Sequence, residues 1–116
     1  MKLPLADEAE VPREKIVLYL LNSEHRAGKG KARFFASHGF VVEDWEKLAG
    51  ALRQHARDRE LTKEEITPLG VRFVVEGDMT MPDGMVAGVR AVWFIESGER
   101  VPRLVTAYPL NRKQQV

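Results

Sequence analysis

The sequence predicts one α+β domain, in which three N-terminal helices pack on one face of a C-terminal antiparallel sheet, a meander of three to four strands. Two observations predict this class. Apolar residues recur at three- and four-residue spacing up to about residue 57, and they alternate with period two after residue 70. The 116 residues suffice for one modest core, so 1–116 is expected to be a single domain, with 110–116 as a frayed tail.

The helices are expected at residues 11–21, 31–37 and 43–57. The first helix has Pro12 in its first turn, where proline is tolerated. The third has the clearest amphipathic stripe of the three. Residues 57–65 alternate in charge, and we expect them to form a solvated helix end and a loop.

The strands are expected at residues 71–76, 85–96 and 103–108, where apolar and polar side chains alternate. Pro82-Asp83-Gly84 predicts a tight turn, because proline presets one dihedral angle and glycine accepts the left-handed one. Ser97-Gly98-Glu99 predicts a second turn. Strands joined by tight turns indicate an antiparallel meander.

The last strand includes the segment Leu104-Val105-Thr106-Ala107-Tyr108-Pro109. Because side chains alternate along a strand, Thr106 and Tyr108 are expected to point one way, and Val105 and Ala107 the other. A hydroxyl and a phenol on one face can hydrogen-bond a phosphate. The alternative is that both are ordinary strand residues, since both types favour strands.

A second polar segment, residues 24–33, places an imidazole, four cations and two glycines at the start of the second helix. The peptide N–H groups of a helix N-terminus favour an anion, so this segment is a candidate phosphate site. It is not a P-loop, because the required glycine and lysine spacing is missing. The candidate substrate-binding residues are Arg26, Lys29, Arg33 and His38, and the candidate catalytic residues are His25, Lys31, Thr106 and Tyr108.

Each histidine also has a structural interpretation. His25 lies in a polar loop and can be simply exposed. His38 precedes Gly39 at a helix end, where it can cap carbonyl groups. His55 falls on or beside the apolar stripe of the third helix, and we expect it to be a packing residue.

Composition excludes several classes of protein. The chain has no cysteine and three histidines without metal-ligand spacing, so we expect no metal site and no cofactor. The longest apolar run, residues 16–21, is too short to span a membrane, and the N-terminus has no apolar signal core. We therefore expect a cytoplasmic protein with no membrane partner. The net charge of +1 fits a local anion site better than a broad nucleic-acid track.

The two polar segments together resemble a bacterial domain family of unknown function. Its members pair a Leu-Leu-Asn-x-x-His-x-x-Gly-x-x-Lys-Ala-x-x-Phe segment with a C-terminal Pro-Arg-Leu-Val-Thr-x-Tyr segment. The matching residues here lie within residues 20–35 and 102–108. The resemblance runs over most of the chain, and it implies no settled activity.

The order of helices followed by a sheet is also distantly similar to the barnase, EndoU, colicin and RelE group of small ribonuclease toxins. Several contact-dependent toxins of that group end on a similar Thr-Ala-Tyr-Pro strand. The resemblance implies an active site built from Thr106, Tyr108, a histidine (His25 or His38) and Lys31 as the basic residue.

Two functions remain open on the sequence. The first is a metal-independent, toxin-like endoribonuclease that cleaves RNA by 2′-hydroxyl attack. The second is a non-catalytic domain that binds an anion or a protein partner, such as a small antitoxin-like protein. The chain begins with its own Met1, so we expect an independent domain rather than a fragment of a larger toxin. The oligomeric state is open.

Overall fold

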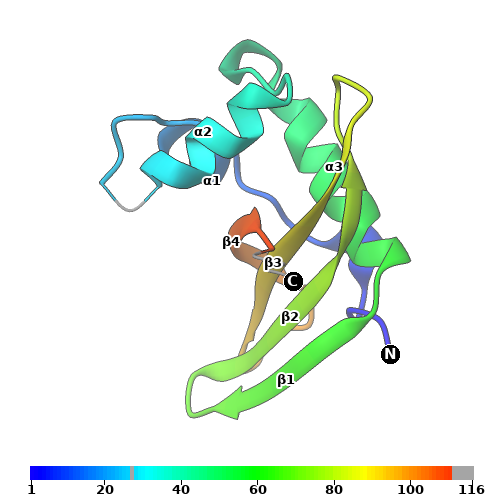
Figure 1. Ribbon diagram of the computed structural model, residues 1–116. Helices are drawn as coiled ribbons and strands as arrows, with labels where there is room; N and C mark the ends of the chain where they lie inside the picture. Colours follow the sequence, from blue (N-terminus) through cyan, green and yellow to red (C-terminus); the bar gives the residue numbers. More distant parts are fainter. Residues whose placement is uncertain (27, 111–116) are drawn as a thin grey trace.

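A computed structural model describes residues 1–26 and 28–110. Short helical segments and helices precede a four-stranded sheet, which confirms the α+β class (Figure 1). In chain order the elements are the 3₁₀ turn η1 (Ala6–Glu8), α1 (Arg13–Lys15), the π-helical η2 (Ile16–Leu20), α2 (Lys29–Ser37), the 3₁₀ turn η3 (Val42–Asp44), α3 (Trp45–Asp58), β1 (Leu61–Thr67), β2 (Gly70–Thr80), β3 (Val86–Glu96) and β4 (Arg103–Pro109).

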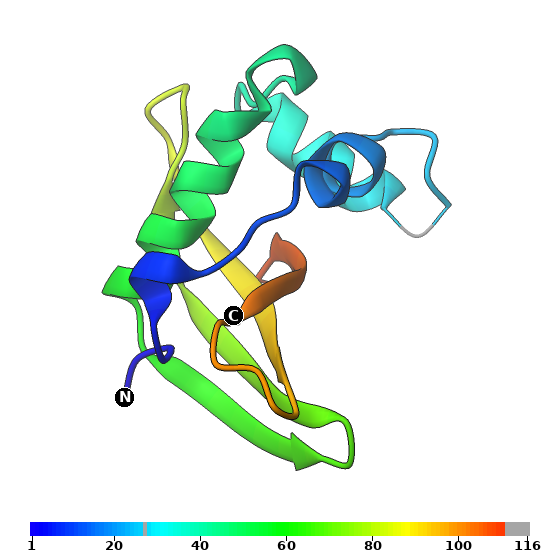
Figure 2. The ribbon, with the colours of Figure 1, turned by 180° about the vertical axis from the view of Figure 1, so that it is seen from behind.

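The sheet is an antiparallel meander in the order β1-β2-β3-β4. Helix α3 runs along one face of it, and α1, η2 and α2 lie beside the N-terminal part of α3, on the side of β4 (Figures 1 and 2). The core lies between the helices and this face. One cross-strand row of the core face consists of Phe73, Trp93 and Leu104, which are all buried. The helices contribute Ile16 and Leu20, which have no exposed surface.

Strand β1 was not expected, because residues 57–65 read as a helix end and a loop. This prediction was wrong: Leu61–Thr67 pairs with β2 along its length. β1 is an edge strand with mostly exposed side chains, so its sequence lacks the apolar alternation that marks a half-buried strand. Charged side chains at such an edge also discourage pairing with another chain.

Gly70 closes the turn between β1 and β2. Its φ angle of 152° lies in the region that favours glycine, and a Cβ there would come within 2.2 Å of the Ile95 carbonyl oxygen. The Thr67 hydroxyl donates to the Gly70 carbonyl at 2.9 Å and accepts from the Gly70 N–H at 3.2 Å. Side-chain chemistry and glycine geometry thus fix the register of β1 on β2.

A β-bulge in β4 sets the direction of the last polar residues. Trp93 pairs with Leu104 but Val92 pairs with Thr106, so Val105 is the extra residue. Val105 is 40% exposed, and the expectation that it points with Ala107 was wrong. Beyond the bulge, Thr106 and Tyr108 share the sheet face opposite the core, as the alternation predicted.

The last described residue bonds the sheet: the Leu110 N–H donates to the Gly88 carbonyl at 2.9 Å. The rest of the predicted tail, 111–116, lies outside the described residues.

His55 is a packing residue of α3, as expected. It is 3% exposed, and its Nε2–H lies 3.1 Å from the Gly77 carbonyl oxygen and 3.0 Å from that of Val89. Burial lowers the pKa of His55 below 6.5, against the two carbonyl hydrogen bonds, which raise it. The imidazole therefore joins α3 to β2 and β3 in its neutral form.

We expect this imidazole to make stability fall in mild acid. Near pH 6.5 the imidazole binds a proton in the unfolded chain but not in the folded chain. The contribution of neutral His55 to the free energy of unfolding is therefore complete above that pH and declines below it. Melting temperatures measured from about pH 7 to about pH 5 should fall more steeply for the wild type than for His55→Gln, which keeps an N–H donor. Parallel curves would contradict this assignment.

Candidate functional site

Tyr19 joins the two polar segments that the sequence singled out. Its phenol oxygen lies 3.0 Å from Thr106 Oγ1, a hydrogen bond in which either group can donate. Tyr19 belongs to η2, where the Leu21 N–H bonds the Ile16 carbonyl at 2.7 Å and widens the turn. Ile16 and Leu20 stay buried in the core, and Tyr19 reaches past the edge strand β4 to its outer side.

Lys31 lies between two tyrosines. Its Nζ is 5.2 Å from the centroid of the Tyr19 ring and 5.9 Å from that of Tyr108. Tyr108 is contacted by a second cation, since Arg90 Cζ lies 5.7 Å from the ring centroid and Arg90 Nη1 donates to the phenol at 3.4 Å. An ion pair with Glu76 holds the Arg90 side chain. The structure thus brings the predicted Lys31, Thr106 and Tyr108 together.

His25 also packs against Tyr19, with ring centroids 4.8 Å apart in an edge-to-face arrangement. The Gly28 N–H donates to His25 Nδ1 at 3.1 Å. Because Nδ1 is the acceptor, Nε2 carries the proton of the neutral ring. His25 therefore presents an N–H donor, rather than a free lone pair, at Nε2.

Three of these side chains, Tyr19, His25 and Thr106, line an open hollow of about 670 Å³ on the surface together with Lys15. All four side chains are half-buried, so they are accessible to a ligand and are also held by neighbours. A carboxylate, Glu14, lies at the same hollow.

The hollow lowers the pKa of the Tyr19 phenol below 10.0. Burial raises this pKa, but hydrogen bonds with Thr106 and Lys31, and the positive charges of Lys31 and Lys15, together lower it by more. The hydrogen bond with the Tyr108 phenol raises the pKa of Arg90, and the contact with Glu76 raises it further. Neighbouring cations stabilise the phenolate form of a tyrosine, and a phenolate can accept a proton.

The other predicted site residues lie outside this cluster. His38 is at the C-terminal end of α2, where its Nδ1 is 3.0 Å from Asp83 Oδ2 in the β2–β3 turn. The Met85 N–H and then His38 lower the pKa of Asp83. Arg26, Lys29 and Arg33 are exposed on the loop and first turn of α2.

Sequence reasoning missed two contributors, Tyr19 and Arg90. Tyr19 stands in the apolar run 16–21 and reads there as a core residue. Tyr19 could have been recognised because it precedes buried Leu20 and so lies off the buried stripe of the helix. It also carries a polar hydroxyl at the end of its ring. Arg90 lies in the strand expected at residues 85–96, but its pairing with Tyr108 depends on a strand register that the sequence does not reveal.

Within residues 1–26 and 28–110, no group of three or more metal-binding side chains comes together. No helix of the described chain is long and apolar enough to cross a membrane. The side chains that line the hollow carry hydroxyl, phenol, imidazole, ammonium and carboxylate groups.

Gly28 is needed for the contact between the His25 loop and Tyr19. A Cβ at this position would come within 2.6 Å of the Tyr19 carbonyl oxygen and 2.9 Å of its ring. We expect Gly28→Ala to displace the loop and disrupt the contact between the rings of His25 and Tyr19. The NMR chemical shifts of both rings should change as a result. Gly30→Ala is the control, because nothing lies within 4 Å of its Cβ position. Equal spectra for the two variants would contradict the close packing.

The fold and the cluster define an α+β domain with a hollow lined by hydroxyl, imidazole and ammonium groups. The chain belongs to the family described as a domain of unknown function (DUF6883), whose model matches residues 2–111. No curated protein sequence matches the chain. The resemblance to a family of unknown function is thereby confirmed.

A solved structure of similar fold is a chain of the contact-dependent growth inhibition toxin–immunity protein complex from Klebsiella pneumoniae 342. The two chains superpose with a TM-score of 0.72 at 14% sequence identity. The match covers 88% of this chain and 100% of that one. At this identity the likeness concerns the fold.

Proposed function

We propose that this domain is a metal-independent, toxin-like endoribonuclease that cleaves RNA by attack of a 2′-hydroxyl on the adjacent phosphate. The observation that supports it best is the hydrogen bond between Tyr19 and Thr106, with His25 and Lys31 both against the same tyrosine. This arrangement offers a proton acceptor, N–H donors and a positive charge around one accessible hollow. We further infer that it acts on RNA in the cytoplasm.

The proposed reaction uses the phenol and the ammonium as a pair. Tyr19, as phenolate, takes the proton of the 2′-hydroxyl, whose oxygen then bonds to phosphorus. The bond from phosphorus to the 5′ oxygen breaks, and Lys31 supplies the proton to that oxygen. The products are a 2′,3′-cyclic phosphate and a 5′-hydroxyl. The proton returns from Tyr19 to Lys31, which are neighbours, and the cycle is balanced.

The remaining groups bind the phosphate. His25 Nε2–H and the Tyr108 hydroxyl donate to the non-bridging oxygens, and these hydrogen bonds strengthen as negative charge develops there. The Thr106 hydroxyl donates to the Tyr19 phenolate and holds it in place. The exposed Arg26, Lys29 and Arg33 attract the strand to the mouth of the hollow. His38, tied to Asp83, has no part in this proposal.

A second candidate function is binding of a protein partner through the same surface. The specific observation is the fold likeness to a chain from a toxin–immunity protein complex, since such a chain is bound by another protein. In this alternative the basic residues of the α2 loop would meet acidic groups of an antitoxin-like or immunity-like partner. Both functions are compatible if the partner covers the hollow.

Incubation of the purified protein with total RNA in excess chelator tests the nuclease. We expect fragments ending in 2′,3′-cyclic phosphates, identified by mass spectrometry of an oligonucleotide substrate. A His25→Ala, Thr106→Ala double variant should lose the cleavage, and an Arg100→Gln variant, changed at an exposed turn, should keep it. No cleavage by the wild type at any protein-to-RNA ratio would favour the binding function.

A further inference from the structure

We propose that the outer face of the sheet beside Tyr108 holds a second phosphate-binding site, which takes the backbone of single-stranded RNA next to the cleaved bond. The site is a pocket of about 370 Å³. Its polar lining consists of Thr62, Lys63, Arg72, Glu76, Arg90 and Tyr108. This inference rests on the proposed function of the hollow at Thr106, and it names the path of the substrate away from it.

The strand register places the pocket in line with the hollow. Thr106 pairs with Val92, Val92 with Val74, and Val74 with Lys63. Neighbouring strands are about 4.8 Å apart, so Lys63 on β1 lies roughly 14 Å across the sheet from Thr106. A strand of RNA whose reacting phosphate is at Thr106 can therefore meet these cations with its following phosphates.

Tyr108 connects the two sites. Its ring centroid lies 5.9 Å from Lys31 Nζ and 5.7 Å from Arg90 Cζ, and Arg90 and Tyr108 both line the pocket. Lys31 also lies 5.2 Å from the ring of Tyr19, which lines the hollow, so two cations stand between the hollow and the rest of the pocket. Successive cations along a groove are typical of surfaces that bind a single-stranded backbone.

The pocket has more cations than carboxylates, so it carries a net positive charge. Glu65 lies 3.8 Å from Lys63 Nζ and 3.3 Å from Arg72 Nη1, and Glu76 pairs with Arg90. Three cations thus face two carboxylates. The side chains of Lys63 and Arg72 are 59% and 38% exposed, so both ion pairs are solvated and weak and can yield to a phosphate.

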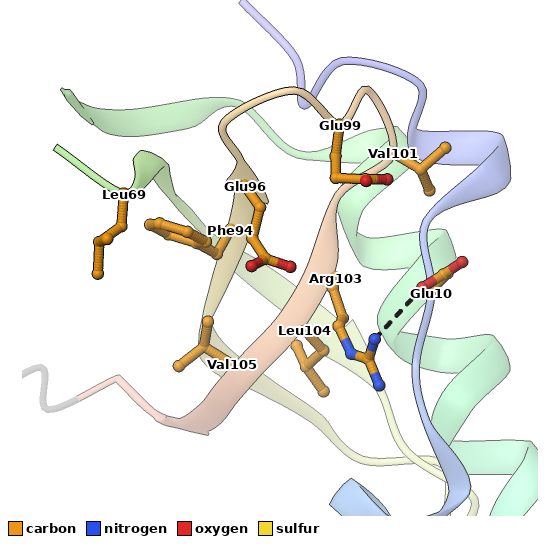
Figure 3. A pocket seen from close by; sticks show the side chains of 9 residues that line it. All are labelled: Glu10, Leu69, Phe94, Glu96, Glu99, Val101, Arg103, Leu104 and Val105. Atoms are coloured by element: carbon orange, nitrogen blue, oxygen red, sulfur yellow. Dashed lines mark ion pairs between the residues drawn. The ribbon is translucent and has the colours of Figure 1, made fainter. Parts of the chain in front are cut away.

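The end of the sheet beyond Phe94, towards the β3–β4 turn, carries more carboxylates than cations, which gives the path a direction. Figure 3 shows Glu96 beside Phe94, Glu99 nearer the turn, and Glu10 on the far side of Arg103, 3.9 Å from its guanidinium. A phosphodiester strand is repelled from this end. The strand therefore leaves the hollow over Tyr108 and Arg90 rather than over Phe94.

Fluorescence anisotropy with a labelled, mixed-sequence 2′-O-methyl oligoribonucleotide tests the site. This probe has no free 2′-hydroxyl and cannot be cleaved by the proposed reaction. We expect the double variant Lys63→Gln/Arg72→Gln to weaken binding roughly tenfold at moderate salt. The slope of log K against log salt should become about 1.4 less steep, because two contacts with single-strand phosphates are lost. The control Lys47→Gln/Arg100→Gln removes the same charge from α3 and the β3–β4 turn.

Equal affinities for the two double variants would overturn the second site, as would a wild type that does not bind the probe. Both double variants should melt close to the wild-type temperature, which ensures that the comparison concerns folded protein. Because the probe reports binding alone, a domain that binds it through Lys63 and Arg72 but cleaves no RNA would refute the proposed nuclease and retain this site.

Discussion

Replacing Tyr19 with phenylalanine is expected to lower RNA cleavage by roughly 10²–10⁴-fold, the usual contribution of a positioned acid or base. The variant keeps the ring that packs on His25 and Lys31, and it removes the oxygen that bonds Thr106. Single-turnover rates on an oligonucleotide substrate measure the effect. Thr106→Ser, which keeps a hydroxyl, should retain most of the activity.

The pH dependence separates a chemical role of Tyr19 from a structural one. Because neighbouring hydrogen bonds and cations outweigh burial and lower the pKa of Tyr19, the phenolate is present above a pKa that lies below 10.0. The wild-type rate should rise with pH up to that value and then level off, and Tyr19→Phe should lose this limb. A variant within about threefold of the wild-type rate at every pH would refute the assignment.

Replacing Trp93 with alanine is expected to reduce the free energy of unfolding by about 3–5 kcal/mol, measured by urea denaturation. Trp93 has no exposed surface and stands on the core face between Phe73 and Leu104. Truncation leaves a large cavity at the centre of the sheet, next to the bulge that directs Thr106. For a small domain this is a large part of the total stability.

Trp93→Phe is the matched control. It keeps an aromatic ring in the core and removes the indole N–H, which has no hydrogen-bond partner among the described residues. Its cost should be clearly smaller than that of Trp93→Ala, because the cavity is smaller and a buried unpaired donor is lost. Equal losses for both variants would show that the position does not depend on filled volume.

Strands β2, β3 and β4 and their turns followed from the sequence, because alternation and turn residues are local properties. β1 did not, since an exposed edge strand has no buried face to impose alternation on its side chains. The start of α2 at Lys29 rather than Lys31 is a difference at an element boundary, where sequence patterns are least informative.

The candidate site divides in a similar way. The alternation in β4 placed Thr106 and Tyr108 on one face, and the basic residues at the start of α2 were evident from composition. The choice of His25 over His38 was open, and packing of His25 on Tyr19 favours it. Tyr19 itself read as core, because a half-buried phenol at a helix edge has the same spacing as a buried ring.

The sequence by itself determined that helices precede the strands β2, β3 and β4, the turns between these strands and the chemistry of the two polar segments. Only the tertiary structure decided that Tyr19 brings these segments together, since it bonds Thr106, 87 positions away, and packs against His25 and Lys31. The physical reason is that periodicity and turn chemistry act over a few residues, whereas a contact across the chain depends on strand register, a bulge and the fit of a widened helical turn against a sheet edge.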